Sequence, residues 1–421
     1  MADFRKTVSH AGQVSGCDLG CVASWRVAIT ADIAVIGLGA VGSAAIYQAA
    51  KLGARVVGMD RFQPPHDQGS SHGETRITRQ AIGEGREFVP LVLRSNEIWE
   101  ELEAATGRNL MTRNGGLILA SDGITGNHHG SNSFLQDTIA AAKSFGIPHR
   151  ELSTAEIGER FPQFQLPADE QGYFEPGAGF LRPEACIETQ IAQARNLGAE
   201  VFTSETVLEL NSNAQAVEVR TDKASYSAAK VILTAGPWIA KFLPREFAPH
   251  FRVYRQTLCW FALQRNTQRY SPERFPIFIW ITGNRVQDML YGFPATDGPA
   301  GGIKVATERY EHTVDPDAVP RDVSDESIAD MYSDYIAPRL PDIGSHCLRS
   351  ATCLYTVTPD AKFVIDYADA NQNVLFASAC SGHGFKHSPA VGEALAQRAL
   401  GVATRLDLSA FRLERLTKTQ L

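Results

Sequence analysis

The pattern of apolar and polar positions predicts that the folded part of the chain begins near Asp32 with a strand, a helix and a second strand. Four consecutive apolar residues at 33–36 have the length of a short buried strand. An alanine-rich helix should run from Ser43 to about Leu52, and the valine-containing run at 55–60 predicts the next strand. This order of elements predicts a βαβ unit with two parallel strands.

Helical and strand patterns alternate along the rest of the chain. The spacing of apolar residues predicts helices at 91–102, 134–145, 187–197 and 389–399. Strands are expected at 200–203, 231–233 and 374–377, with a hairpin over 207–227. Residues 254–304 combine aromatic and β-branched residues with turn signals, which predicts an antiparallel sheet.

Nucleotide-type βα units near both ends, with sheet between them, predict an α/β fold. The chain should leave a Rossmann-type nucleotide-binding domain, build an α+β substrate domain with an antiparallel sheet, and return. The discontinuous nucleotide-binding domain is expected to comprise residues 31–110, 181–245 and 346–421, and the substrate domain residues 111–180 and 246–345. Residues 1–30 are expected to be a disordered N-terminal extension.

The first turn of the βαβ unit carries a G-x-G-x-x-G motif formed by Gly37, Gly39 and Gly42. In such a turn the first glycine permits a tight bend, the second lets the backbone approach a pyrophosphate, and the third lets helix and strand pack closely. Asp60 ends the second strand, where a carboxylate can hold a ribose hydroxyl. A glycine-rich turn without a nucleotide is the alternative, but the flanking strand, helix and acidic residue favour a dinucleotide site.

Composition narrows the class of protein. Apolar residues make up 44% and charged residues 21% of the 421 residues, as in an ordinary globular enzyme. The formal charge of −7 is spread along the chain, and no basic run indicates a nucleic-acid partner. No apolar stretch approaches the ~18 residues that a membrane helix needs. The seven scattered cysteines favour reduced thiols in a cytoplasmic protein, and the close pair Cys17 and Cys21 is interpreted as incidental.

Four unusual segments carry a more specific signal than the glycine turn. They are Pro64-Pro65-His66, the run from His72 to Arg79, Gly83-Glu84-Gly85-Arg86-Glu87 and the loop from Ser381 to Lys386. In these segments, and in order from about Asp32 to Leu413, the chain resembles the family of monomeric sarcosine oxidase and N-methyltryptophan oxidase. That family belongs to the wider group of glycine and D-amino-acid oxidases, so the resemblance implies an FAD enzyme.

The resemblance also implies that the flavin is held covalently. Members of the family join the flavin 8α-methyl group to a cysteine through a thioether, and the matching residue is Cys353, two before Tyr355. From residue type alone, a buried cysteine that packs as a small hydrophobe is the commoner case. We expect the cofactor to be contacted further by Thr75, Arg76, Gly236, Gly382, His383 and Gly384.

The family holds the substrate carboxylate with an arginine and a lysine, which match Arg79 and Lys386. A guanidinium fork takes a carboxylate through two hydrogen bonds, and a lysine adds a point charge. Without the resemblance, Arg79 would be interpreted as a surface ion pair. Tyr291 and Tyr355 match tyrosines that border the substrate, although sheet aromatics more often pack a core.

Two further residues match positions beside the flavin. Lys304 matches the lysine that the family places near flavin N5, where a fixed positive charge would stabilise developing superoxide. His72 matches a residue on the flavin's active face. From residue type alone, Lys304 would be a solvated strand residue and His72 a hydrogen-bonded loop residue.

The chain departs from the family pattern at three places. Glu308 stands where the family usually has histidine, four residues after Lys304, so the pocket is more acidic than in relatives if this side chain faces the substrate. Ser71 replaces another frequent histidine, and the stretch at 297–302 is longer than usual. These departures leave the identity of the substrate open.

His383 and His387 have a spacing that can bind a metal on a helix. The glycines at 382 and 384 disfavour a helix there, and no third ligand is evident, so we expect no metal.

Together these features predict an FAD-dependent oxidase of secondary amines. Sarcosine or another N-methyl amino acid would react with O2 and water to give the primary amino acid, formaldehyde and hydrogen peroxide. Nearby positive charge would lower the pKa of the amine and so favour its neutral, reactive form. N-methyltryptophan, pipecolate and glycine stay open as substrates, and so does a dehydrogenase with another acceptor. A flavoprotein without turnover is disfavoured, and a monomer is expected.

Overall fold

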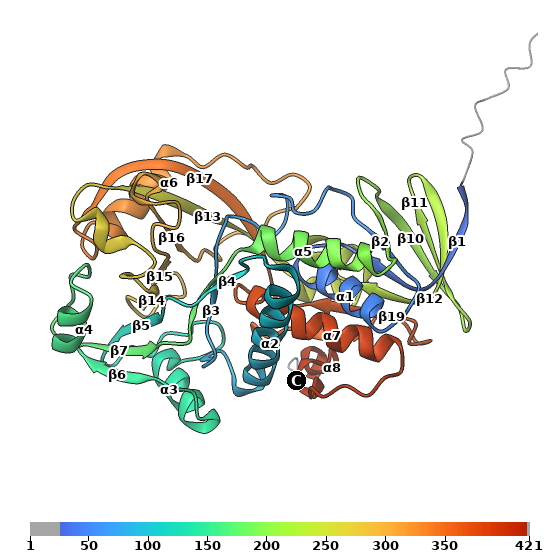
Figure 1. Ribbon diagram of the computed structural model, residues 1–421, viewed down its shortest axis with the longest axis horizontal. Helices are drawn as coiled ribbons and strands as arrows, with labels where there is room; N and C mark the ends of the chain where they lie inside the picture. Colours follow the sequence, from blue (N-terminus) through green and yellow to red (C-terminus); the bar gives the residue numbers. More distant parts are fainter. Residues whose placement is uncertain (1–25, 419–421) are drawn as a thin grey trace, which may run out of the picture.

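The structure of the protein, a computed structural model, describes residues 26–418. They form an elongated molecule with two large sheets side by side, one covered by long helices and one made largely of antiparallel strands (Figure 1). A small sheet of β3 (Arg76–Thr78), β8 (Gly179–Leu181) and β4 (Met111–Thr112) completes the arrangement, with β3 and β4 drawn between the two large parts.

The helix-covered sheet has the strand order of a doubly wound nucleotide-binding fold. Its parallel strands lie in the order β9 (Glu200–Phe202), β2 (Val56–Met59), β1 (Arg26–Ile36), β12 (Ala224–Leu233) and β19 (Val374–Ser378). Numbered along the chain this order is 3-2-1-4-5, so the carboxyl ends of β1 and β12 meet where the order reverses, the usual place for a ligand. Three strands extend the sheet antiparallel: β10 (Val207–Ser212), β11 (Val217–Thr221) and β18 (Val364–Tyr367).

Both faces of the central strand β1 are buried. Ile33 and Val35 belong to the core that contains residues of α1 (Ala40–Lys51), α5 (Pro183–Asn196) and α7 (Ser388–Ala399). Ala34 and Ile36 belong to the core on the other face, because successive strand residues point to opposite sides. Burial on both faces explains the unbroken apolar run at 33–36. The helix α2 (Val89–Thr106) packs on α7, and α8 (Glu414–Lys418) follows near the end of the chain (Figure 1).

The predicted elements are confirmed, with differences at their ends. The helix at 134–145 is α3 (Phe134–Phe145), and the hairpin at 207–227 is formed by β10, β11 and the start of β12. One expectation was wrong. Residues 26–30, assigned to a disordered extension, are the first part of β1, because the long strand β12 offers a pairing partner as far as Ala224. Residues 1–25, with Cys17 and Cys21, lie outside the described residues.

The second large sheet confirms the predicted antiparallel region and adds one parallel pair. Its order is β17 (Ile343–Val357), β13 (Arg252–Leu263), β16 (Ile303–Thr307), β15 (Met289–Gly292), β14 (Ile277–Ile281), β5 (Gly116–Ser121), β7 (Glu170–Glu175) and β6 (Arg150–Ser153). Only the pair of β14 and β5 is parallel. The helices α3 and α4 (Thr154–Arg160) pack beside β7, and α6 (Asp325–Asp330) lies near the other end of the sheet (Figure 1).

The domain boundary expected at residue 346 falls inside β17. This strand pairs with β13 from Ile343 to Val357, so the chain leaves the second sheet after Val357. The boundary differs from the prediction because pairing with β13, with register shifts near Phe261, keeps the whole of β17 in the second sheet.

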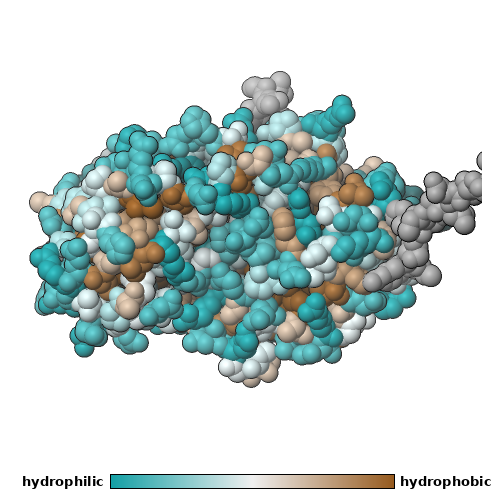
Figure 2. All heavy atoms as spheres, turned by 90° about the horizontal axis from the view of Figure 1, so that it is seen from above, coloured by the Kyte–Doolittle hydropathy of each residue, from teal (hydrophilic) through white to brown (hydrophobic). Residues whose placement is uncertain are grey.

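On the face shown in Figure 2, apolar residues form small separate groups within a hydrophilic surface. Among residues 26–418, no helix is both long and apolar enough to cross a membrane.

Candidate active site

The glycine-rich turn after β1 is shaped by close contacts that only glycine allows. Gly37 has a φ of 84°, in the left-handed region. A Cβ on Gly42 would lie 1.8 Å from the carbonyl oxygen of Gly37, so this glycine lets α1 pack directly on the turn. Thr234, at the end of β12, closes the turn by donating its hydroxyl to Gly37 O over 2.7 Å. The glycine-rich turn therefore has the geometry that its motif predicts, and it lies at the switch point between β1 and β12.

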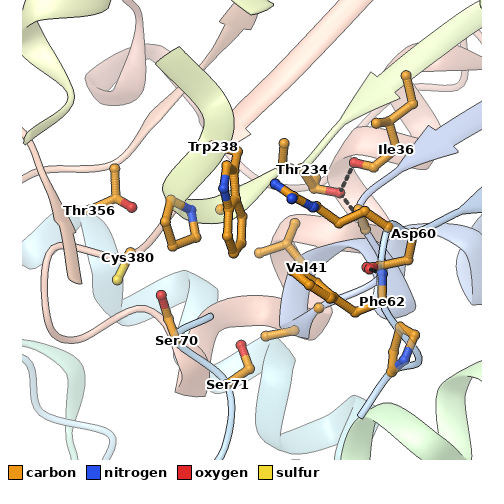
Figure 3. Close-up of a pocket in the computed structure, with 18 of the residues that line it drawn as sticks. Ile36, Val41, Asp60, Phe62, Ser70, Ser71, Thr234, Trp238, Thr356 and Cys380 are labelled. Atoms are coloured by element: carbon orange, nitrogen blue, oxygen red, sulfur yellow. Dashed lines mark hydrogen bonds between the residues drawn. The ribbon is translucent and has the colours of Figure 1, made fainter. Parts of the chain in front are cut away.

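A cavity of about 460 Å³ opens at this point (Figure 3). It is lined at one end by Gly37, Gly39, Asp60 and Gly236, and further along by Ser70, Thr356 and Cys380. The N-terminus of α1 has no side-chain cap, which leaves backbone N–H groups available to an anion. The buried hydroxyls of Ser70 and Thr356 have no hydrogen-bond partner among the described residues. The cavity therefore fits a long polar dinucleotide.

Asp60 accepts two hydrogen bonds from the backbone around the glycine-rich turn. Its Oδ2 accepts the backbone N–H of Leu38 over 2.8 Å, and its Oδ1 accepts that of Phe62 over 2.8 Å. These bonds tie the end of β2 to the glycine-rich turn. Asp60 also lines the large cavity beside Trp238, so it is placed to meet a ribose hydroxyl.

A smaller cavity of about 70 Å³ adjoins the large one. Four residues line both cavities, namely Arg76, Tyr355, Gly382 and Phe385. Most of the residues predicted to bind substrate line the smaller cavity, including Arg79, Lys386, Tyr291 and Tyr355. Tyr291 and Tyr355 share a hydrogen bond of 3.2 Å between their hydroxyls. The structure thus places a small polar pocket at the end of the dinucleotide cavity.

Two cations and a carboxylate form the charged end of the small cavity. Arg79 donates from Nη2 to Glu84 Oε2 over 2.5 Å, and Lys386 Nζ lies 3.8 Å from Glu84 Oε1. Burial opposes the ionisation of Glu84, but Arg79 and Lys386 outweigh it and hold the pKa of Glu84 well below its ordinary value. The Nε of Arg79 is buried without a hydrogen-bond partner among the described residues. An unpaired guanidinium N–H in this position suits a ligand carboxylate.

Lys304 is buried beneath the turn that holds Thr75. Its Nζ donates to the carbonyl oxygens of Gly73 and Thr75, each over 2.7 Å, and lies 4.4 Å from the ring centroid of Phe293. Burial, reinforced by the charge of Arg76, lowers the pKa of Lys304 well below its ordinary value. Lys304 is therefore a fixed, dry amino group rather than the solvated strand residue that its type suggests.

Cys353 lies in the middle of β17 and is 1% exposed. Its sulfur is 3.9 Å from Nη2 of Arg76, the residue that lines both cavities. Burial raises the pKa of the Cys353 thiol to about 11 even though Arg76 opposes the shift. A second cysteine, Cys380, lines the large cavity directly (Figure 3).

Lys304 and Cys353 line neither cavity, and the remaining predicted residues differ in where they lie. Thr75 and His383 line the small cavity, whereas Gly382 lines both and Gly384 the large one. His72 lies outside the lining of both cavities, and burial together with Arg76 lowers its pKa to about 3, so its ring is neutral. Within the described chain, no group of three or more possible ligands could hold a metal ion.

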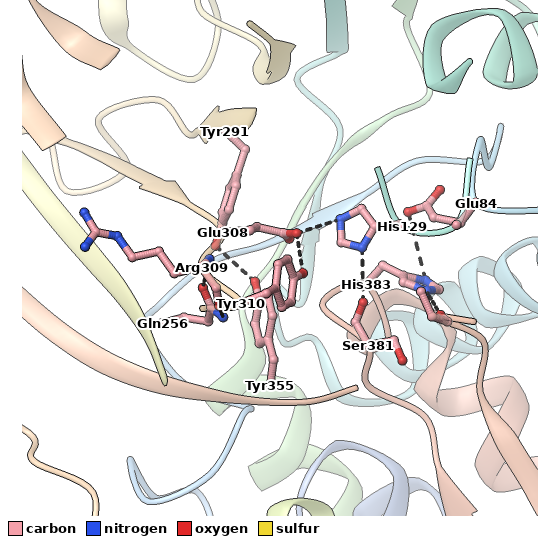
Figure 4. A network of polar contacts seen from close by, with 12 residues as sticks. Glu84, His129, Gln256, Tyr291, Glu308, Arg309, Tyr310, Tyr355, Ser381 and His383 are labelled. Atoms are coloured by element: carbon pink, nitrogen blue, oxygen red, sulfur yellow. Dashed lines mark hydrogen bonds and ion pairs between the residues drawn. The ribbon is translucent and has the colours of Figure 1, made fainter. Parts of the chain in front are cut away.

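Sequence reasoning missed a polar network that joins the two sides of the small cavity (Figure 4). Glu308 pairs with His129 over 3.1 Å between Oε2 and Nε2, and it accepts the hydroxyl of Tyr310 over 2.5 Å. Glu84 belongs to a segment singled out by the sequence, but its task as partner of Arg79 was not foreseen. His129 comes from the loop between β5 and α3, and nothing in its local sequence indicates a place in the site.

Comparisons with known proteins agree with this architecture. The profile of the FAD dependent oxidoreductase (DAO) family matches residues 32–398. Monomeric sarcosine oxidase from Streptomyces avermitilis is 37% identical over 92% of this chain and 98% of its own. N-methyl-L-tryptophan oxidase from Yersinia pestis (strain Pestoides F) is 35% identical over 91% of this chain and 99% of its own.

Solved structures share the fold at lower identity. NikD, an amino acid oxidase of nikkomycin biosynthesis, has a TM-score of 0.77 at 24% identity and covers 91% of this chain and 97% of its own. L-proline dehydrogenase from P. horikoshii has the same TM-score at 20% identity and covers 94% of this chain and 100% of its own. The profile match and the sequence identities show that the chain belongs to the FAD-dependent oxidoreductase (DAO) family, together with monomeric sarcosine oxidase and N-methyl-L-tryptophan oxidase.

Proposed function

We propose that the protein oxidises a small secondary-amine amino acid, with sarcosine as the first candidate. The observation that supports this proposal is the pair Arg79 and Lys386, which line a small cavity that adjoins the dinucleotide cavity. Two cations at one end of such a cavity select a carboxylate. The names of the sequence relatives supply the chemistry, because they are oxidases of N-methylated amino acids.

The size of the cavity favours sarcosine over a bulky substrate. Its volume of about 70 Å³ corresponds to roughly five water positions. A small N-methyl or cyclic amino acid fits such a space, whereas the indole of N-methyltryptophan does not. The residues Ile279, Met289 and Phe134 line the wall and limit a larger side chain.

Turnover tests this proposal directly. We expect purified protein to consume oxygen and form hydrogen peroxide and formaldehyde with sarcosine, with little or no activity on N-methyltryptophan. Pipecolate and glycine should be tested as well. Pipecolate shows whether a cyclic secondary amine is accepted, and glycine shows whether the N-methyl group is required. Reduction of an artificial dye without peroxide formation would instead indicate a dehydrogenase, and no reduction by any amino acid would contradict the proposal.

The residues of the chain bind and orient the substrate. Arg79 and Lys386 hold its carboxylate, which turns the carbon beside the nitrogen toward the junction lined by Arg76 and Tyr355. When bound, FAD supplies the hydride acceptor and the electrons that reduce oxygen. Burial of the site excludes water, and Lys304, held by the carbonyl oxygens of Gly73 and Thr75, would supply positive charge where oxygen reacts.

A covalent bond between the cofactor and Cys353 is part of the proposal. After acid denaturation, yellow flavin should stay with the protein pellet of the wild type and move to the supernatant for Cys353→Ser. The matched control is Cys380→Ser, because Cys380 also lines the dinucleotide cavity and is partly exposed. Retention of flavin by Cys353→Ser, or its release by Cys380→Ser, would contradict the assignment of Cys353.

Lys386 predicts a pH dependence of carboxylate binding. Burial lowers the pKa of Lys386 to about 7, with Glu84 opposing and Arg79 reinforcing the shift. A bound carboxylate favours the charged form, so the affinity for methoxyacetate should be constant below about pH 7. Above it, affinity should fall by up to about tenfold per pH unit. Flavin absorbance titrations would measure this, and Lys386→Met should flatten the curve. A slope that persists in Lys386→Met would belong to another group, such as His129.

The names of the sequence relatives also suggest an oligomeric state. Because sequence relatives at 36–37% identity are named monomeric sarcosine oxidases, we propose that this chain is a monomer as well.

A further inference from the structure

Glu308 stands at the inner end of β16, directly after the strand that carries Lys304. Its side chain is 4% exposed and lines the small cavity together with Arg79 and Lys386. Oε2 is fully engaged, since it meets His129 Nε2 and the Tyr310 hydroxyl. Both polar contacts of the Glu308 side chain with residues 26–418 are made by Oε2, so Oε1 accepts no hydrogen bond from them; it lies 3.1 Å from the point where a Cβ on Gly382 would sit. Gly382 thus leaves room for this oxygen at the junction of the two cavities.

His129 fixes the charge of Glu308. Its Nε2 faces the Glu308 carboxylate, and its Nδ1 lies 3.2 Å from the carbonyl oxygen of Ser381. Both neighbours are acceptors, so both ring nitrogens must donate and the ring is an imidazolium. Burial opposes this charge, but Glu308 outweighs it and raises the pKa of His129. The imidazolium of His129 and the carboxylate of Glu308 thus form a buried ion pair.

The two carboxylates of the small cavity differ in what they can still bind. Glu84 is occupied by Arg79 on one oxygen, while its other oxygen faces Lys386 and His383. His129 lies between Glu84 and Glu308 (Figure 4). The hydroxyls of Tyr291 and Tyr355 bond each other. Glu308 Oε1 is therefore the acceptor left open in a cavity whose other end attracts a carboxylate.

We propose that Glu308 is a specificity-determining residue that accepts an N–H from the amine of the substrate. This inference rests on the proposed function, because it takes the carboxylate of an amino acid to lie at Arg79 and Lys386. In a cavity of about 70 Å³, a small amino acid held at that end has its nitrogen close to the remaining wall. Glu308 accepts from an ammonium and from a neutral secondary amine alike, and His129 and Tyr310 are positioning residues that hold it.

The proposal predicts discrimination between two ligands of nearly equal shape. Sarcosine carries an amine N–H, whereas methoxyacetate has an ether oxygen in the same place and can only accept. When methoxyacetate is bound, its ether oxygen would face the carboxylate oxygen of Glu308. Both atoms are hydrogen-bond acceptors, so they stay unpaired and repel each other. A hydrogen bond to a charged group contributes about 1.5–3 kcal/mol, which corresponds to roughly 10–150-fold in affinity.

The test compares these ligands in the flavin-loaded wild type and E308Q. Anaerobic flavin reduction gives the half-saturating concentration of sarcosine, and flavin absorbance gives the affinity for methoxyacetate. E308Q should bind sarcosine about tenfold more weakly and methoxyacetate more tightly, because its amide can donate to the ether oxygen. Equal changes for both ligands would overturn the inference and leave Glu308 a structural residue.

Control variants distinguish the effect of the Glu308 charge from a change in the packing around it. Tyr310→Phe removes a hydrogen bond to Glu308 but keeps the carboxylate, so the variant should still bind sarcosine more tightly than methoxyacetate. Loss of that preference in Tyr310→Phe to the extent expected of E308Q would overturn the assignment to the charge of Glu308. If E308Q does not retain flavin, E308D replaces it and should still prefer sarcosine. Failure of the wild type to bind either ligand would refute the proposed function itself, whereas normal wild-type binding with an unchanged ligand ratio in E308Q refutes this inference alone.

Discussion

Lys304→Met should slow reoxidation of the reduced enzyme by oxygen by about 10²–10³-fold while reduction by the substrate stays within about tenfold. The variant keeps the length and much of the volume of the side chain and removes its amino group. In the wild type that group is buried, held by the carbonyl oxygens of Gly73 and Thr75 at 2.7 Å, and lies over the Phe293 ring. A fixed positive group in a dry site stabilises charge that develops on oxygen far more than a solvated one does.

Stopped-flow measurement separates the two half-reactions of Lys304→Met. Anaerobic mixing with sarcosine reports reduction, and mixing of reduced enzyme with oxygen reports reoxidation. The matched control is Lys143→Met, because Lys143 is a solvent-exposed lysine paired with Glu151 and its loss should change neither rate. Equal losses in both half-reactions of Lys304→Met would show that Lys304 shapes the site rather than reacting with oxygen. A thermal melt is needed as well, because two buried carbonyl groups lose their donor, at about 1–3 kcal/mol each.

Loss of the Arg79 charge should produce the opposite pattern, with kcat/KM for sarcosine lowered by about 10³-fold or more and oxygen reactivity preserved. The side chains of Arg79 and its partner Glu84 are each 2% exposed, so removal of the arginine alone would leave a buried carboxylate with Lys386, 3.8 Å away, as its remaining cationic neighbour. Breaking such a pair costs about 3–5 kcal/mol of stability. The informative variant is therefore Arg79→Met combined with Glu84→Gln, which removes both charges together.

Two further variants test whether Arg79 holds the substrate carboxylate. Arg79→Lys keeps the charge but loses the guanidinium fork, so it should recover part of the lost kcat/KM. Glu84→Gln alone frees Arg79 and should not reproduce the loss. If the double variant binds methoxyacetate as tightly as the wild type does, the carboxylate is held elsewhere and the assignment of Arg79 is wrong.

Local sequence was sufficient for the nucleotide-binding half of the molecule. The apolar run at 33–36, the glycines of the turn and the acid at 60 each reflect a requirement of backbone geometry or burial within one βαβ unit. Such requirements act over a few residues, so they are visible in the chain itself. The start of β1 and the domain boundary at residue 346 were misjudged because strand length depends on the partner strand, and β12 and β13 lie far away in sequence.

The sequence by itself determined the fold class and predicted a dinucleotide site, and its resemblance to a family predicted roles for the cationic residues Arg79, Lys304 and Lys386. Only the tertiary structure decided how these charges are balanced. Glu84 comes to Arg79 from five residues away, but His129 reaches Glu308 across 179 positions of the chain and Arg76 reaches Cys353 across 277. Pairing of buried charges is a matter of distance and dielectric in space, which no local pattern of residues encodes.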